Sequence, residues 1–110
     1  MTTGILITGI LGRLFGRSGG IRVHLLLKGR IGDGWHDVDR RLRLPQGATL
    51  ETLLDVAESQ GIPLRRAIEE SPHLRETLMH NGERCRVDEN LDRLLEDGDQ
   101  IYLLAPVAGG

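Results

Sequence analysis

A strict alternation of apolar and mostly polar residues from Ile21 to Lys28 constrains the fold more than any other feature of the sequence. Every second position is aliphatic, and the series is Ile21, Val23, Leu25, Leu27. A period of two predicts a strand with one buried face. The glycine- and aspartate-rich stretch 29–34 predicts a turn, and residues 35–44 predict a second strand that ends at Pro45. Val38, Leu42 and Leu44 of this second strand are expected to point inward.

The period changes to that of a helix after Pro45-Gln46-Gly47. Thr49 can accept a hydrogen bond from the first turn of a helix as its N-cap. The next apolar residues fall at i, i+3, i+4 and i+7, which puts them in one stripe: Leu50, Leu53, Leu54, Ala57. Gly61 and Pro63 end this helix, and a short second helical segment is expected over 64–70.

The last third of the sequence predicts short strands joined by tight turns. Asn81-Gly82 between residues 77–80 and 83–87 is a strong local signal for a hairpin. A helical turn over 90–95, a turn at 97–99 and a final strand through Ile101 and Leu103 follow. The order of two strands, a helix and further strands predicts an α+β domain, with a mixed sheet packed on one main helix.

Length and composition exclude several classes of function. A chain of 110 residues forms one domain and can bury a core. Aromatic residues are only 3%, so we expect no platform for stacking nucleic-acid bases and no nucleic-acid partner. A single cysteine, Cys85, excludes an internal disulfide, and we expect it to be buried and structural. The histidines show no metal-ligand spacing, so no metal site is expected.

The net charge of −2 hides an uneven distribution along the chain. Residues 1–50 carry eight Arg or Lys and three Asp, and residues 51–110 carry six Arg and thirteen Asp or Glu. The densest acidic stretch lies within 88–99. Such a stretch is either a solvated face or a docking surface for a basic partner.

Residues 1–20 differ from the rest of the chain. Six glycines interrupt an aliphatic segment with helical spacing, which favours a flexible or partner-dependent extension before a domain over 21–110. The apolar run is too short to span a bilayer. Its positive charges, Arg13 and Arg17, follow the run, the reverse of a secretory signal. We therefore expect a cytoplasmic protein without a membrane partner, although a surface or oligomer anchor stays open for this segment.

The sequence ends in Gly109-Gly110, directly after the last predicted strand. A backbone without Cβ atoms can pass through a narrow channel that side chains would block. Such a tail suits an enzyme that activates a C-terminal carboxylate. The structural alternative is a glycine pair without function.

Three segments together resemble the ubiquitin-like sulfur-carrier family (MoaD/ThiS). Residues 94–110 read LLEDGDQIYLLAPVAGG, which is similar to the end of these carriers, residues 44–54 (LPQGATLETLL) resemble their strand-to-helix entry, and Asn81-Gly82-Glu83 resembles their hairpin. The resemblance covers about residues 21–110. It implies a ubiquitin-like β-grasp fold and a carrier that is not catalytic by itself.

The resemblance also implies a chemistry for the tail. An ATP-dependent adenylating enzyme, similar to ubiquitin-activating enzymes, would adenylate Gly110, with Gly109 beside it, and a sulfur donor would convert the product to a thiocarboxylate for cofactor biosynthesis. The chain itself would bind no cofactor. The ending P-V-A-G-G favours the small subunit of molybdopterin synthase, whose large subunit would be a second partner.

Residues next to the tail are candidates for partner binding. They are Tyr102, Leu104, Pro106, Val107 and Ala108, which either form a docking patch or simply complete the sheet. Trp35 is either a packing lid or a contact of a partner. Two other functions stay open: a thiamine-type carrier, and a ubiquitin-like module that binds other proteins or is conjugated to them through Gly110.

Overall fold

The computed structural model describes residues 20–31 and 34–105, and all structural statements below concern these residues. Two long strands open the described chain, β1 (Gly20–Ile31) and β2 (Gly34–Pro45). They pair antiparallel from Gly20–Pro45 to Ile31–Gly34. The prediction of a turn over 29–34 is therefore wrong at positions 29–31 and 34, which belong to the two paired strands. Ile31 is buried in the core, which favours continued pairing over an early turn.

Three helices follow the hairpin. They are α2 (Leu50–Ser59), α3 (Leu64–Glu70) and α4 (Pro72–Thr77). The expected cap of α2 is confirmed, because the Thr49 side chain accepts a hydrogen bond from the Thr52 backbone and the Thr52 side chain reaches back to the Thr49 backbone. Helix α4 was not expected from the sequence. Its signals are Ser71, whose side chain caps Leu74, and Pro72 at the first helical position.

The remaining elements are short. Strands β3 (Met79–His80) and β4 (Glu83–Arg84) form a hairpin, a 3₁₀ turn spans Val87–Glu89, and β5 (Gln100–Leu104) is the last described strand along the chain. Asn81 and Gly82 both have positive φ, 52° and 85°, as a two-residue hairpin turn requires. Residues 90–95 form turns and one isolated bridge rather than the expected helical turn, which lies earlier in the chain.

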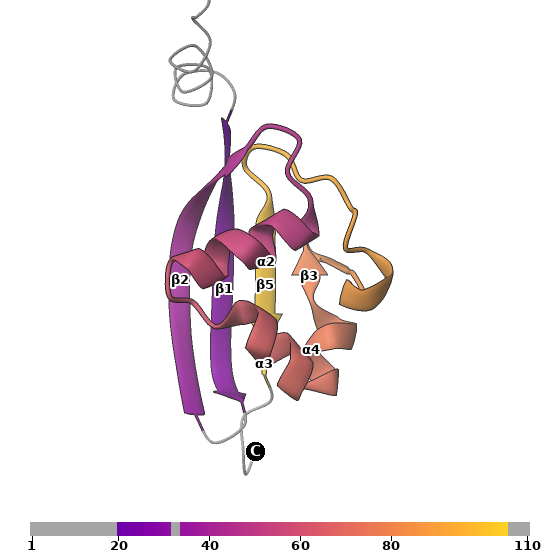
Figure 1. Ribbon diagram of the computed structural model, residues 1–110. Helices are drawn as coiled ribbons and strands as arrows, with labels where there is room; N and C mark the ends of the chain where they lie inside the picture. Colours follow the sequence, from indigo (N-terminus) through magenta and orange to yellow (C-terminus); the bar gives the residue numbers. More distant parts are fainter. Residues whose placement is uncertain (1–19, 32–33, 106–110) are drawn as a thin grey trace, which may run out of the picture.

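The sheet has the order β2-β1-β5-β3-β4, with β5 parallel to β1 and antiparallel to β3. Figure 1 shows the helices crossing one face of this sheet. The expected stripe of α2 is buried against the alternating residues of β1, in one aliphatic core that contains Ile21, Val23, Leu25, Leu27, Leu42, Leu44, Leu50, Leu53, Leu54 and Ala57. Val38 is partly buried beside them. The mixed sheet on one main helix is confirmed.

Candidate functional site

The end of β5 is the last described part of the chain before the C-terminal residues 106–110. Strand β5 lies inside the sheet between β1 and β3, and its arrow in Figure 1 points to the end where the β1–β2 hairpin closes. The next residue, Ala105, is buried, and its backbone N–H donates to the Lys28 carbonyl at 2.8 Å. The chain is therefore held to β1 up to Ala105, one residue before Pro106.

Gly29 makes this close approach sterically feasible. Its φ is +123°, and a Cβ at this position would lie 2.7 Å from the Ala105 Cβ and 2.9 Å from the Ala105 carbonyl oxygen. Real Cβ atoms do not approach that closely, so a side chain at position 29 would displace Ala105. The position of Ala105 thus depends on a glycine whose role the sequence did not reveal, because Gly29 looked like part of a turn.

The face of the sheet opposite the helices, called the open face below, carries the two described candidates for partner binding. Tyr102 is half-buried, and Leu104 is 49% exposed two residues further along the same face. The register places Tyr102 between Leu26 of β1 and Met79 of β3. Leu26 is the one apolar residue in the polar series of β1, and that break in the pattern is the sequence signal for this patch.

Trp35 belongs to the same end of the open face. It pairs with Arg30 and is 62% exposed, so it is not the packing lid that the sequence left open. Lys28, which pairs with Leu104, also forms an ion pair with Asp37 at 3.2 Å. The tail end of the open face thus combines exposed apolar groups with a small charged pair, which is the usual composition of a protein docking surface.

Tyr102 is fixed by a chain of polar contacts that the sequence did not predict. Its ring meets the His24 ring edge-on, with centroids 5.5 Å apart, and its hydroxyl lies 3.5 Å from His24 Nδ1. His24 Nε2 lies 2.6 Å from Asp39 Oδ1. This hydrogen bond from His24 lowers the pKa of Asp39 below its usual range. The contacts orient Tyr102, which stays half-buried on the open face.

The other predicted site residues lie outside the described part of the chain. They are Pro106, Val107, Ala108, Gly109 and Gly110. The proposed extension over 1–20 also falls outside it, apart from Gly20, which begins β1.

Cys85 is confirmed as a buried residue. It is 2% exposed, its backbone N–H donates to the Leu78 carbonyl at 2.7 Å, and its sulfur lies 3.5 Å from an Arg93 nitrogen. Within residues 20–31 and 34–105, no three His, Cys, Asp or Glu side chains gather closely enough to hold a metal ion. In the same residues, no helix is long and apolar enough to cross a membrane.

Parts of the acidic stretch serve the fold. The Asp97 side chain accepts a hydrogen bond from the Arg22 backbone at 2.8 Å. Asp99 is buried and accepts hydrogen bonds from the Asn81 side chain and the Glu96 backbone, and it pairs with His80 at 2.8 Å. Asp99 is therefore not part of a solvated face, whereas Asp97 is exposed and uses one carboxylate oxygen within the fold.

Comparison with known proteins agrees with this arrangement. The model of the ThiS family matches residues 31–110. The solution structure of the Haloferax volcanii HVO 2177 protein is similar to this chain, with a TM-score of 0.50 and 19% sequence identity over 84% of this chain and 89% of that one. A search of curated proteins gave no significant match. At this identity the structural likeness supports the fold, a ubiquitin-like β-grasp, and nothing further. The family model covers well over half of the sequence, from the end of β1 through β5 to the glycine tail, and the chain therefore belongs to the ThiS family of ubiquitin-like sulfur carriers.

Proposed function

We propose that this carrier transports sulfur as a thiocarboxylate on Gly110, which a partner enzyme forms by ATP-dependent adenylation. Membership of the ThiS family supports the carrier role and the kind of partner. The observation that carries the proposal is the surface around Ala105, the last described residue. Ala105 is held against β1 beside exposed Leu104 and Trp35, so a partner that takes in the residues after Ala105 also meets an apolar surface.

The chemistry belongs to the tail and the partner rather than to side chains of the fold. A carboxylate is a poor acyl donor, so its oxygen would first attack the α-phosphorus of ATP and release pyrophosphate. A sulfur nucleophile at the oxidation level of hydrosulfide would then attack the carbonyl carbon, and AMP would leave with the C–O–P oxygen. The product is a thiocarboxylate whose sulfur is itself a nucleophile. The carrier holds no cofactor of its own in this scheme.

The docking role falls to the open face and to the residues before the glycine pair. Tyr102 and Leu104 would contact the activating enzyme while Pro106, Val107 and Ala108 enter its channel, where Gly109 adds no side chain. For the acceptor we favour a molybdopterin-type pathway, with the large subunit of molybdopterin synthase as second partner, because the sequence ends in P-V-A-G-G. A cytoplasmic location fits this proposal.

Intact mass spectrometry tests the tail chemistry. The protein is incubated with a ThiS-type activating enzyme, ATP and sulfide, with a known carrier as positive control. We expect a mass gain equal to the difference between sulfur and oxygen, and no gain when Gly110 is deleted. A ladder of adducts on other proteins would instead identify a protein modifier. No change, while the control carrier reacts, would refute the carrier chemistry.

A pair of leucine variants tests the docking face. Leu104→Asp places a charge on the open face, whereas Leu94→Asp places the same charge at a leucine that is 65% exposed outside the five strands. We expect Leu104→Asp to lower kcat/KM of adenylation about tenfold, mainly through KM, because burying a charge in a docking interface is unfavourable. Leu94→Asp should have little effect. Equal effects of both variants would remove the open face from the interface.

Sulfur delivery distinguishes the two carrier branches. The thiocarboxylate form is offered to the large subunit of molybdopterin synthase with its precursor, and separately to a thiazole-forming enzyme of thiamine synthesis. Loss of the mass gain with the first acceptor alone is the result we expect. Loss with the second alone would assign the thiamine branch.

A further inference from the structure

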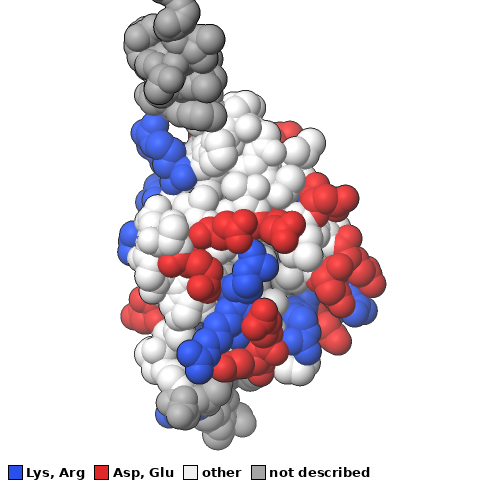
Figure 2. All heavy atoms as spheres, in the orientation of Figure 1, with Lys and Arg blue, Asp and Glu red and all other residues white. Residues whose placement is uncertain are grey.

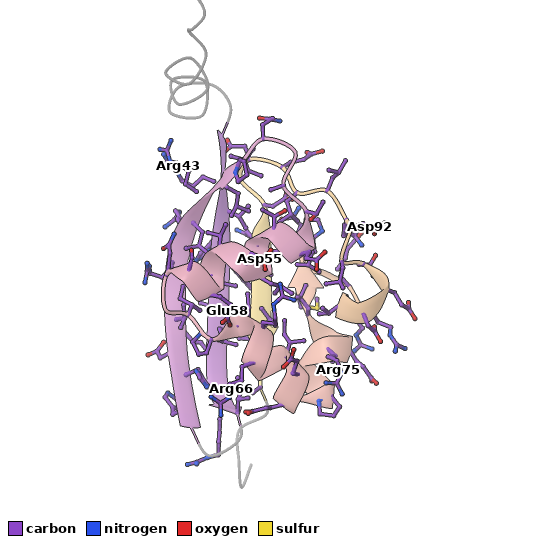
Figure 3. The ribbon with its side chains drawn as sticks, viewed as in Figure 1. Arg43, Asp55, Glu58, Arg66, Arg75 and Asp92 are labelled. Atoms are coloured by element: carbon purple, nitrogen blue, oxygen red, sulfur yellow. The ribbon has the colours of Figure 1, made fainter. Side chains whose placement is uncertain are left out.

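A groove of about 660 Å³ lies at the end of the sheet remote from the tail. It is formed where β1 and β5 begin and β2 ends, and its charged lining comes from Arg22, Arg41, Arg43 and Asp97. Figure 3 labels Arg43 at this upper end, opposite the arrowhead of β5 in Figure 1. The groove therefore takes no part in positioning the residues after Ala105.

The arginines of the groove are arranged unfavourably for the fold alone. Arg22 and Arg43 are direct cross-strand partners, and Arg41 is the partner of His24, the next residue on the same face. Like charges directly opposite one another in an antiparallel pair destabilise a sheet. All three arginine side chains are exposed, so water weakens this repulsion without removing it.

Acidic neighbours neutralise this cluster only in part. Within the described residues, none of these three guanidinium groups forms an ion pair or a hydrogen bond. Asp97 lines the groove, but its Oδ1 accepts from the Arg22 backbone N–H. The Asp39 carboxylate interacts electrostatically with Arg41, but its hydrogen-bond partner is His24. The groove thus keeps a net positive charge with its guanidinium donors turned to solvent.

The spacing of the arginines suits one kind of anion best. Arg41 and Arg43 are two residues apart on β2, so their Cα atoms lie about 7 Å apart along the strand. Side chains at alternate positions of another extended chain repeat at the same interval. A guanidinium binds a carboxylate through two parallel hydrogen bonds. Strand β2 is also an edge of the sheet, where β1 is its one partner among the described strands, so an extended chain has access.

We propose that this groove, defined by Arg22, Arg41 and Arg43, binds an extended acidic segment of a partner protein, with carboxylates at alternate positions facing the arginines. The inference does not depend on the tail chemistry, because it concerns the opposite end of the open face. It also gives a reason for the cross-strand repulsion, which the acidic segment relieves when it binds.

The test uses the full chain and a fluorescent synthetic peptide of alternating glutamate and serine, measured by anisotropy at an ionic strength of about 0.15 M, where the screening length is about 8 Å. The double variant Arg41→Gln with Arg43→Gln removes the groove charges. Arg30→Gln with Arg84→Gln is the matched control, because by register both lie on the open face but away from the groove. We expect binding about tenfold weaker in the groove variant and changed less than about twofold in the control.

Urea unfolding of the variants and competition by other ligands separate the proposal from its alternatives. Removing like charges should leave the urea midpoint of the groove variant unchanged or higher, whereas a lower midpoint would show that the arginines serve the fold. A peptide of alternating glutamine and serine should not bind. The proposal is wrong if the glutamate peptide does not bind, if both double variants weaken it equally, or if inorganic phosphate at equal concentration displaces it, which would identify a small-anion site.

Discussion

Gly29 carries a constraint that no other residue type can meet. Its φ of +123° is disfavoured for residues with a Cβ, and the Ala105 Cβ and carbonyl oxygen occupy the space that a side chain would need. Both the backbone angle and the crowding depend on where β5 ends beside β1. The identity of one residue in the first strand thus controls the position of Ala105, the last described residue.

Replacing Gly29 by alanine should destabilise the protein by about 3 kcal/mol, since overpacking and an unfavourable φ both contribute. Urea unfolding measures the change. Gly47→Ala is the control, because Gly47 has a φ of +86° but no atom within 4 Å of an added Cβ, so it reports the backbone cost alone. If both variants lose the same stability, crowding against Ala105 is absent. Adding Ala105→Gly to Gly29→Ala should recover part of the difference.

At the scale of elements, Asp99 links the turn before β5 to the β3–β4 hairpin. Burial would raise the pKa of this carboxyl, but hydrogen bonds from Asn81, the Glu96 N–H and His80 outweigh it and hold the pKa below the ordinary value of 3.8. Asn81 completes the link, because its side chain accepts from the Gln100 backbone at 2.8 Å. Two-residue strands have few ladder bonds of their own, so this polar cluster fixes the hairpin to β5.

The lowered pKa of Asp99 predicts a pH dependence. The folded-state pKa lies below the unfolded one, so the carboxylate stabilises the fold above about pH 4, and this stabilisation is lost as the pH falls through the folded pKa. Asp99→Asn should lower the free energy of unfolding by about 2 kcal/mol near neutral pH, because the hydrogen-bond donors around position 99 lose the charged carboxylate as their acceptor. In urea titrations, the gap to the wild type should narrow on acidification.

Asp92→Asn is the comparison for this carboxyl, because Asp92 is exposed, as its outward side chain in Figure 3 illustrates. The free energy of unfolding of the Asp92→Asn variant should equal that of the wild type at every pH. A gap between Asp99→Asn and the wild type that stays constant down to pH 2 would contradict the link between ionisation and stability.

At the scale of the whole molecule, the open face has two ends with different chemistry. The tail end presents exposed Leu104 and Trp35 beside half-buried Tyr102, and the remote end presents the arginine groove. The helix side shown in Figure 2 carries interspersed charges of both signs, with acidic groups gathered on its right side. The two proposed docking regions are therefore separate in space as well as in chemistry.

This separation predicts additive effects on stability. Position 36, the partner of Gly29, and position 43 lie seven residues apart on β2, which is about 23 Å. The combined variant Gly29→Ala with Arg43→Gln should therefore equal the sum of the two single changes in unfolding free energy within about 0.5 kcal/mol. A larger deviation in urea unfolding would show that the two ends are coupled through the sheet.

Local patterns in the sequence determined the elements whose signals lie close together in the chain. The alternation from Ile21, the cap at Thr49 and the Asn81-Gly82 turn each specify their structure through neighbours, and all three are confirmed. Helix α4 is not predicted although Ser71-Pro72 marks its start, because the same two residues also mark the end of the preceding helical segment. Glycines at 29 and 34 suggested a turn, but the register with the core extended the strands.

What only the tertiary structure decided depends on residues that are distant in the chain. The sequence names Gly29, Asp99 and the arginines but does not show their contacts. It does not show that Gly29 lies against Ala105 or that Asp99 is hydrogen-bonded to the β3–β4 hairpin. Nor does it show that Arg22 pairs with Arg43 across the strands. Those contacts follow from the register of β1 with β2 and β5. Register is set by the burial of a whole sheet face, because a shift of one residue would turn every apolar side chain to water. The sequence alone therefore determined the elements with strong local signals and the family resemblance, while the packed sheet decided which residues meet at either end of its open face.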